Sequence, residues 1–325
     1  MDRGGFIISL DFELHWGAPE LWDLKVKKDY FDNTRKSVPE VLSLFKKYGI
    51  HATWATVGFL FANDKKQLLE FSPDQKPHYK NNNFNYYKLI DENVVGENEM
   101  NDPYHFAPTL IKKIADTPNQ EVGSHTFSHY YCNEPGQNVK QFSADLKAAQ
   151  QLSKANFNIE LKSLVFPRNQ FNEEYISAAK KSGIKVVRSN PDVWFWKEKF
   201  SNIAPLARAW DTLFPINKTL TFNDQLSYVD NVLLLPASRF LRAYTAKEKS
   251  VQQLKMNRIK AEMLYAAKND RYYHLWWHPH NFGNAVKENL YYLEEVLIYF
   301  KDLNRTYDFP SMSMIEMHDN LAGKK

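Results

Sequence analysis

Two hydrophobic periods alternate along the chain and predict strands followed by helices. A buried strand is predicted where a short run of β-branched and aromatic residues ends at polar residues. A helix is predicted where apolar residues share one face, as Val38, Val41, Leu42 and Phe45 do before Gly49. The predicted strands are residues 5–10, 51–59, 121–124, 163–166, 185–188, 229–235 and 272–277. The predicted helices are residues 34–48, 107–115, 137–155, 173–182, 251–268 and 286–303.

This order of elements predicts an α/β fold, because strands that alternate with helices pair in parallel as a sheet or barrel. Two stretches, residues 62–106 and 190–225, are polar or irregular and are expected to be insertions that cover the barrel or act as lids. No internal repeat interrupts the pattern. We therefore expect one catalytic domain over residues 1–325.

Composition narrows the class of protein. Of 325 residues, 43% are hydrophobic and 25% are charged, which is ordinary for a globular protein that is not embedded in a membrane. The net charge of +4 comes without a basic run, so nucleic acid is not an expected partner. Cys132 is the only cysteine, and the N-terminus lacks the apolar core of a secretory signal. With no apolar run long enough for a membrane span, we expect a cytoplasmic protein.

Histidines and acids at the ends of predicted strands are the candidate chemistry. His125 and His129 follow a strand and are four residues apart, so on a helical turn the two imidazoles would share one face. Imidazoles with a carboxylate suit a divalent transition metal. Asp11 and Glu13 follow the first strand and would face one side of an extended backbone. A metal-dependent hydrolase needs one acid as a ligand and one as a base.

His278 ends the last predicted strand, and Trp276 lies on the same face. A histidine there could protonate a leaving amine, although His274 or His280 is an alternative for that role. The carboxyl ends of the strands of a barrel meet at one rim, so these polar groups are expected to converge. The high aromatic content, 15%, is consistent with a core rich in rings and with a cleft that binds sugar faces.

Five short motifs, in order along the chain, resemble those of the polysaccharide deacetylase family (NodB homology, carbohydrate esterase family 4). They are residues 9–13 (SLDFE), 125–129 (HTFSH), 166–169 (FPRN), 192–194 (DVW) and 277–279 (WHP). The second motif is the most specific of the five. The resemblance implies a distorted, incomplete (β/α)7 barrel that hydrolyses the acetamide of a sugar and releases acetate.

The resemblance also implies a role for each motif. Asp11 would be the general base, and Glu13, His125 and His129 would hold a divalent metal, with zinc favoured over cobalt or nickel. His278 would be the general acid. Arg168 would hold Asp11 in place, and Asp192 would tune the catalytic histidine. The residues expected to contact the carbohydrate are Trp194, Trp276 and Tyr130.

Two departures from the family pattern keep alternatives open. The usual pair of aspartates is Asp11 and Glu13 here, so either acid could be the ligand. Asn169 and Gln170 follow Arg168 where the family has Pro-Tyr, which changes the expected substrate contacts. The competing functions are a metal-independent amidohydrolase that acts on a small cyclic amide, and a non-catalytic carbohydrate-binding protein. An N-acetylated sugar or glycan intermediate is the expected substrate, and the oligomeric state is not predicted.

Overall fold

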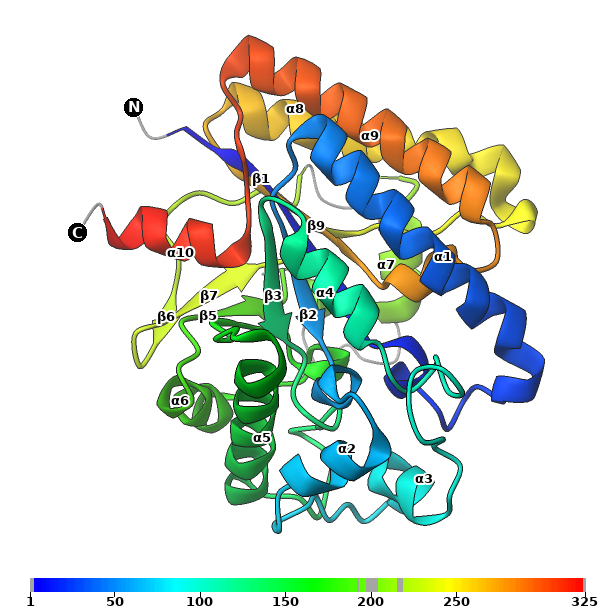
Figure 1. Cartoon of the computed structure of the whole chain (residues 1–325). Helices are drawn as coiled ribbons and strands as arrows, with labels where there is room; N and C mark the ends of the chain where they lie inside the picture. The colour runs from blue at the N-terminus through cyan, green and yellow to red at the C-terminus, as the bar shows by residue number, and fades with distance from the viewer. Residues whose placement is uncertain (1–2, 192, 197–203, 215–218, 324–325) are drawn as a thin grey trace.

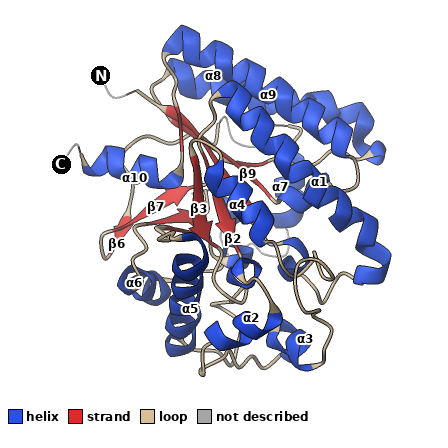
Figure 2. Cartoon of the chain, in the orientation of Figure 1, coloured by secondary structure: helices blue, strands red, loops and turns tan. Residues whose placement is uncertain are grey.

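The computed structural model describes residues 3–191, 193–196, 204–214 and 219–323. Within these ranges ten strands form one curled sheet with helices around it (Figures 1 and 2). The strands are β1 (Gly5–Phe12), β2 (Ala52–Thr56), β3 (Gln120–Ser124), β4 (Ser163–Leu164), β5 (Val186–Ser189), β6 (Tyr228–Val229), β7 (Val232–Pro236), β8 (Arg239–Phe240), β9 (Tyr272–Trp277) and β10 (Ser311–Met312). The helices are α1 (Leu24–Tyr48), α2 (Lys65–Phe71), α3 (Tyr87–Asp91), α4 (Pro108–Asp116), α5 (Val139–Phe157), α6 (Glu173–Lys181), α7 (Ala204–Asp211), α8 (Gln252–Lys268), α9 (Val286–Tyr307) and α10 (Met314–Ala322).

The sheet curls until its two ends are linked by one segment of chain. Its neighbouring strands run parallel in the order β7-β5-β4-β3-β2-β1-β9. β7 pairs with β5, whereas β8, two residues further along the chain, pairs with β9. The bent segment 232–240 therefore bridges β5 and β9, but only two residues of β8 complete the ring. The predicted class, a distorted and incomplete α/β barrel, is confirmed.

Side chains that alternate along the strands fill the barrel in layers. One inner layer is apolar and packs against α10. Its members include Ile7, Ala55, Val165, Val186, Leu233, Tyr272, Met314 and Met317. Two residues further along their strands, Ser9, Arg188 and His274 replace the apolar side chains and are fully buried. The interior therefore changes from apolar to polar toward the carboxyl ends of the strands.

The outer helices bury one face each against the sheet. α1, α8 and α9 lie side by side over β1 and β9, and α5 packs with α6 on another side (Figure 1). α1 is longer than the predicted helix 34–48, because it begins at Leu24, where the Asp23 side chain accepts a hydrogen bond from the amide of Lys25. Residues 24–33 escaped the prediction since they are mostly polar and carry little apolar periodicity.

Other differences from the predicted elements have local causes. The predicted strand 229–235 is a hairpin, because Asp230 and Asn231 adopt left-handed backbone angles (φ 48° and 66°) between β6 and β7. The strand predicted over residues 51–59 ends at Thr56. The predicted irregular stretch 190–225 contains α7, and β10 and α10 were not predicted.

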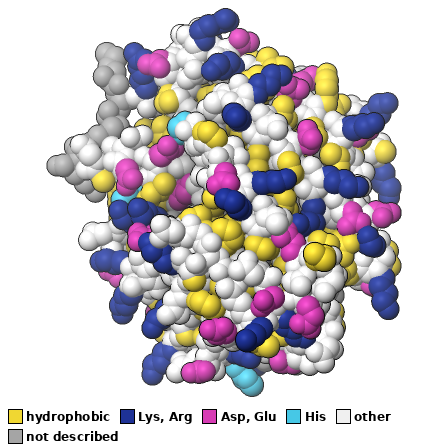
Figure 3. All heavy atoms as spheres, viewed as in Figure 1, with side chains coloured by type: hydrophobic (Ala, Val, Ile, Leu, Met, Phe, Trp, Pro, Cys, Tyr) yellow, Lys and Arg dark blue, Asp and Glu magenta, His cyan; other side chains and the backbone are white. Residues whose placement is uncertain are grey.

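The outer surface gives no sign of a single charged face in the view of Figure 3. Lysine and arginine side chains are interspersed there with aspartate and glutamate. Among the described residues, no helix combines the length and apolar character that crossing a membrane requires.

Candidate metal centre and active site

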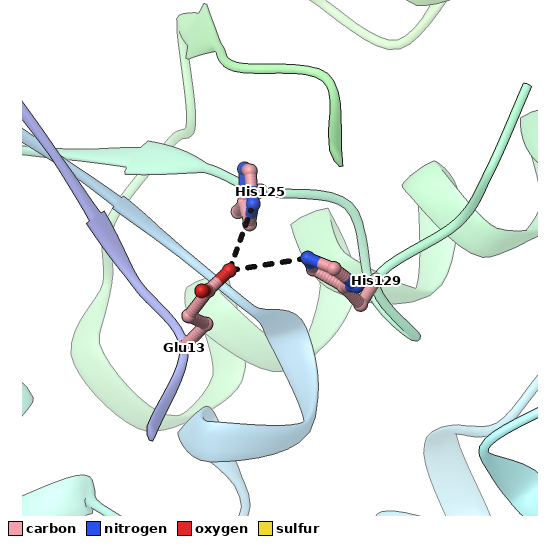
Figure 4. A group of neighbouring side chains, drawn as sticks. All are labelled: Glu13, His125 and His129. Atoms are coloured by element: carbon pink, nitrogen blue, oxygen red, sulfur yellow. Dashed lines mark hydrogen bonds and ion pairs between the residues drawn. The ribbon is translucent and has the colours of Figure 1, made fainter. Parts of the chain in front are cut away.

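Three ligand-type side chains converge at the carboxyl end of the barrel. Glu13 follows β1, and His125 and His129 lie in the loop after β3 (Figure 4). Glu13 Oε2 lies 3.1 Å from His129 Nε2 and 3.3 Å from His125 Nε2. One ligand atom from each residue lies within 4.8 Å of the others, and all three side chains are buried. This is the spacing and chemistry of a divalent cation site.

The hydrogen bond of His125 leaves its other ring nitrogen directed at Glu13, as a metal ligand would be. His125 Nδ1 lies 2.8 Å from the carbonyl oxygen of Val165, which can only accept, so Nδ1 carries the proton. In the neutral ring, Nε2 then presents its lone pair to the Glu13 carboxylate. Two lone pairs that face each other at 3.3 Å repel unless a proton or a metal ion lies between them. The carbonyl is also the kind of outer partner that fixes the orientation of a metal-binding histidine.

The loop that carries the two histidines is not the predicted helical turn. Thr126 and His129 have left-handed backbone angles (φ 63° and 57°), which a β-branched residue such as threonine rarely adopts. The Thr126 hydroxyl donates to the carbonyl of His125 and accepts from the amide of Tyr130. Asp145 of α5 accepts hydrogen bonds from the amides of Phe127 and Ser128. These contacts, rather than helical spacing, bring the two imidazoles together.

Asp11 is held by Arg188 of β5, a residue that the sequence reasoning missed. The guanidinium binds both carboxylate oxygens, at 2.6 Å and 2.7 Å, and also donates to Ser9 Oγ and Asn169 Oδ1. The Ser9 hydroxyl lies 2.8 Å from His274 Nε2, so the polar layer is a connected network. One feature of the sequence indicated this contact. The charged residue Arg188 lies two positions after the apolar Val186, so both side chains are on the same face of a predicted strand.

The expectation that Arg168 holds Asp11 is wrong. Arg168 lies in a turn after β4 with a left-handed backbone (φ 55°), and its guanidinium pairs with Glu20 at 2.7 Å. It also stacks over the rings of Phe84 and Tyr131. The turn aims Arg168 toward the rim of the barrel, whereas Arg188 points into the barrel from its strand.

His278 and His280 approach the other oxygen of Glu13. His278 Nε2 lies 3.8 Å from Glu13 Oε1 and 3.5 Å from Asp11 Oδ2, and His280 Nδ1 lies 3.6 Å from Glu13 Oε1. The side chain of His278 is 25% exposed, whereas that of His280 is only 4% exposed. His278 Nδ1 is within hydrogen-bonding distance of Asn281 Oδ1. Of the two, His278 is therefore the one that a substrate could reach.

Charges within this cluster shift its acids and bases. Burial raises the pKa of Asp11, but the charge and hydrogen bonds of Arg188, together with the charges of His278 and His125, outweigh it and the pKa lies below its usual value. Burial also raises the pKa of Glu13, yet His278 and the two loop histidines bring this pKa well below its usual value. Burial lowers the pKa of His274, and that of His280, to about 3, so both rings are neutral near pH 7.

The comparisons with known proteins agree with this site. The family model described as polysaccharide deacetylase matches residues 29–187. Over these residues, slightly less than half of its length, the chain is similar to the polysaccharide deacetylase family. No curated protein matches the sequence. The fold resembles that of a protein assigned to the polysaccharide deacetylases from Mycobacterium smegmatis, with 10% identity, a TM-score of 0.61, and coverage of 100% of this chain and 92% of that one. A similar assignment from Pseudomonas aeruginosa PAO1 gives 9% identity, a TM-score of 0.57, and coverage of 99% and 90%.

Two of the residues expected to contact the substrate lie near this site. Trp276 packs under Arg188, whose guanidinium carbon lies 4.1 Å from the ring centroid, and it contacts the ring of His278. A cavity of about 330 Å³ adjoins His278, and its walls combine aromatic rings with polar and charged side chains. Its lining includes Phe195, Trp196, Phe240 and Trp276. Trp194 is 37% exposed and packs edge-on against Phe195, one of these wall residues.

The third expected substrate contact, Tyr130, and the predicted catalytic residue Asp192 have different outcomes. The expectation that Tyr130 contacts the substrate is wrong, because its ring is fully buried in a core cluster against Phe142. Its hydroxyl is satisfied by Gln137 and the carbonyl of Asn138. Asp192 lies outside the described residues, so its predicted role stays a prediction.

Proposed function

We propose that this chain is a metal-dependent N-deacetylase that removes the acetyl group from an amino sugar or glycan precursor. Glu13, His125 and His129 would hold the divalent ion, with zinc favoured by the two imidazoles and one carboxylate. The single observation that carries the proposal is the Glu13 carboxylate facing two imidazole nitrogens at 3.1 Å and 3.3 Å, next to Asp11 and His278. When bound, such an ion polarises the amide carbonyl and acidifies water.

Asp11 is the general base in this proposal. A base must be ionised to accept a proton, and Arg188 keeps this buried carboxyl in the ionised form. The bidentate contact also fixes the direction of the carboxylate, because two parallel hydrogen bonds allow little rotation. With both oxygens bound to Arg188, Asp11 is better suited to accept a proton than to ligate the ion.

His278 is the general acid. It is the histidine on the wall of the cavity, and its Nδ1–H can donate to Asn281 while Nε2 faces the reacting groups. A proton on Nε2 lies between Asp11 and Glu13 until the leaving amine takes it. The mixture of aromatic rings and polar side chains in the cavity beside His278 suits a sugar, since flat apolar rings stack on sugar faces and polar groups bind hydroxyls.

Metal content after loading with zinc, cobalt or nickel tests this proposal. We expect one tightly bound ion per chain in the wild type and none in the variant His125→Ala/His129→Ala. Asp11→Asn, the matched control, should keep the ion and lose acetate release from N-acetylated sugars. Loss of the ion in Asp11→Asn would instead make Asp11 a ligand. A wild type that binds no ion would favour the metal-independent amidohydrolase.

A further inference from the structure

The two oxygens of Glu13 have different surroundings. Oε2 faces the nitrogens of His125 and His129, and Oε1 points to the opposite side, toward His278 and His280. Glutamate has one more rotatable bond than aspartate, so this side chain needs outside contacts to keep Oε2 directed at the histidine pair. The residues around Oε1 are the candidates to supply them.

His280 presents a buried ring nitrogen without a partner to this oxygen. Its Nδ1 is buried, has no hydrogen-bond partner among the described residues, and lies 3.6 Å from Glu13 Oε1. The ring is enclosed by Trp22, Tyr30 and Phe31 and stacks on His278. A buried polar atom without a partner is costly, and a shift of a few tenths of an ångström would let a proton on Nδ1 make the hydrogen bond to Oε1.

Gly17 leaves the space that the carboxylate occupies. A methyl group at this position would lie 2.2 Å from Glu13 Oε1 and 2.4 Å from the carboxyl carbon. The 3-10 turn Leu14–Gly17 folds back on Glu13, and the amide of Trp16 donates to the Glu13 carbonyl. Any side chain at Gly17 would therefore move the carboxylate or open this turn.

The turn that carries Gly17 is itself fixed from the insertion 62–106. His15 Nδ1 lies 2.9 Å from His105 Nε2, and His105 Nδ1 lies 2.7 Å from an oxygen of Asp102. The indole of Trp16 donates to the carbonyl of His105. Buried hydrogen bonds thus fix the turn that borders the space beside Glu13.

We propose that His280 and Gly17 are positioning residues for the carboxylate of Glu13. His280 donates Nδ1–H to Oε1, Gly17 admits the carboxylate, and together they direct Oε2 toward the ion. The inference rests on the proposed function, because it concerns the affinity of that metal site. Loss of an outer hydrogen-bond partner of this kind typically costs 10–100-fold in metal affinity.

Zinc affinity, measured by competition with a chromophoric chelator, tests this inference without any substrate. Asparagine can place an amide donor near the position of Nδ1, whereas glutamine places it near Nε2. We therefore expect His280→Asn to bind zinc nearly as the wild type does, and His280→Gln to bind it roughly 10–100-fold more weakly. Gly17→Ala should show a similar loss. Gly323→Ala, where a methyl group meets only ordinary contacts, is the matched control.

Circular dichroism of the metal-free proteins separates a local effect from loss of fold. Equal zinc affinity in His280→Gln and the wild type would overturn the inference. Equal weakening in His280→Asn and His280→Gln would do so too, because it would reduce His280 to a packing residue. Should Gly17→Ala fail to fold, the two His280 variants still decide. A wild type that binds no zinc would overturn the proposed function and this inference with it.

Discussion

Asp11 and Glu13 lie two residues apart at the end of β1, but their carboxylates have different interaction partners. Asp11 meets a permanent cation, Arg188, whereas Glu13 meets only imidazoles. Two carboxylates against one guanidinium leave a formal charge of −1 before any histidine is protonated. An excess of buried negative charge would stabilise a bound dication. In the proposed mechanism the two acids have different roles because their partners differ.

Replacement of Arg188 by glutamine is expected to change the pH dependence of the reaction. The guanidinium lowers the pKa of Asp11 against the opposing effect of burial, so its loss leaves burial dominant and the pKa rises. Asp11 then protonates at a higher pH, kcat/KM falls, and the acid limb of its pH profile moves upward. The profile of acetate release measures this shift. Arg168→Gln, which removes a partner of Glu20 instead, should keep the wild-type limb. An unmoved limb in Arg188→Gln would contradict this assignment.

The candidate ligands were predictable from the sequence at this scale, but their neighbours were not. A strand end followed by His125 and His129 is a local pattern, and the structure brings both to Glu13 as expected. Arg168 and Arg188 could not be ranked in the same way. Which arginine reaches Asp11 depends on whether its backbone is a strand or a left-handed turn, and that is decided by packing across the barrel.

At the level of elements, the loop between β3 and α5 is held by a side chain that lies outside the motif. Asp145 is fully buried and accepts from two amides and from the Ser128 hydroxyl. Burial raises its pKa to about 6, although these three hydrogen bonds favour the carboxylate. Sequence periodicity places Asp145 on a helix but does not show that it faces this loop. Local propensities likewise do not predict that Thr126, a β-branched residue, adopts a positive φ.

Asp145→Asn is expected to destabilise the protein, most strongly at low pH. The NH2 group of asparagine cannot accept the hydrogen bond that the second carboxylate oxygen accepts. One donor in the loop therefore loses its partner, which lowers the free energy of unfolding by about 1–3 kcal/mol. In the wild type the folded-state pKa of about 6 exceeds the ordinary value of 3.8, so the folded state binds more protons between these values. The contribution of Asp145 therefore falls as pH rises from 4 to 6, and the deficit of the variant should shrink. Urea unfolding at pH 4, 5 and 7 measures it, and a deficit that grows with pH would contradict the argument.

Across the whole molecule, the ligand atoms come from distant parts of the chain. Glu13 follows the first strand, and His125 and His129 follow the third, so the site joins segments that only the folded barrel brings together. The alternation of strands and helices made the barrel predictable. The closure of the barrel was not predictable, because segment 232–240 bends and pairs with β5 through β7 and with β9 through β8. Helix α10 was not predicted either. Its apolar side chains are buried against the amino end of the barrel, so their role depends on strands that come from distant parts of the chain.

A site assembled this way should link metal binding to global stability. The unfolded chain cannot hold Glu13 beside the two histidines, so an ion that binds the folded state alone raises the free energy of unfolding by RT ln(1 + [metal]/Kd). At a free concentration 100 times Kd the gain is about 2.7 kcal/mol. Thermal unfolding of the wild type should therefore shift upward with the logarithm of zinc concentration, and a chelator should reverse the shift. In His125→Ala/His129→Ala the transition should not depend on zinc. An equal shift in both proteins would show that zinc binds elsewhere on the surface, and the cluster at the end of the barrel would then contribute no metal site to the fold.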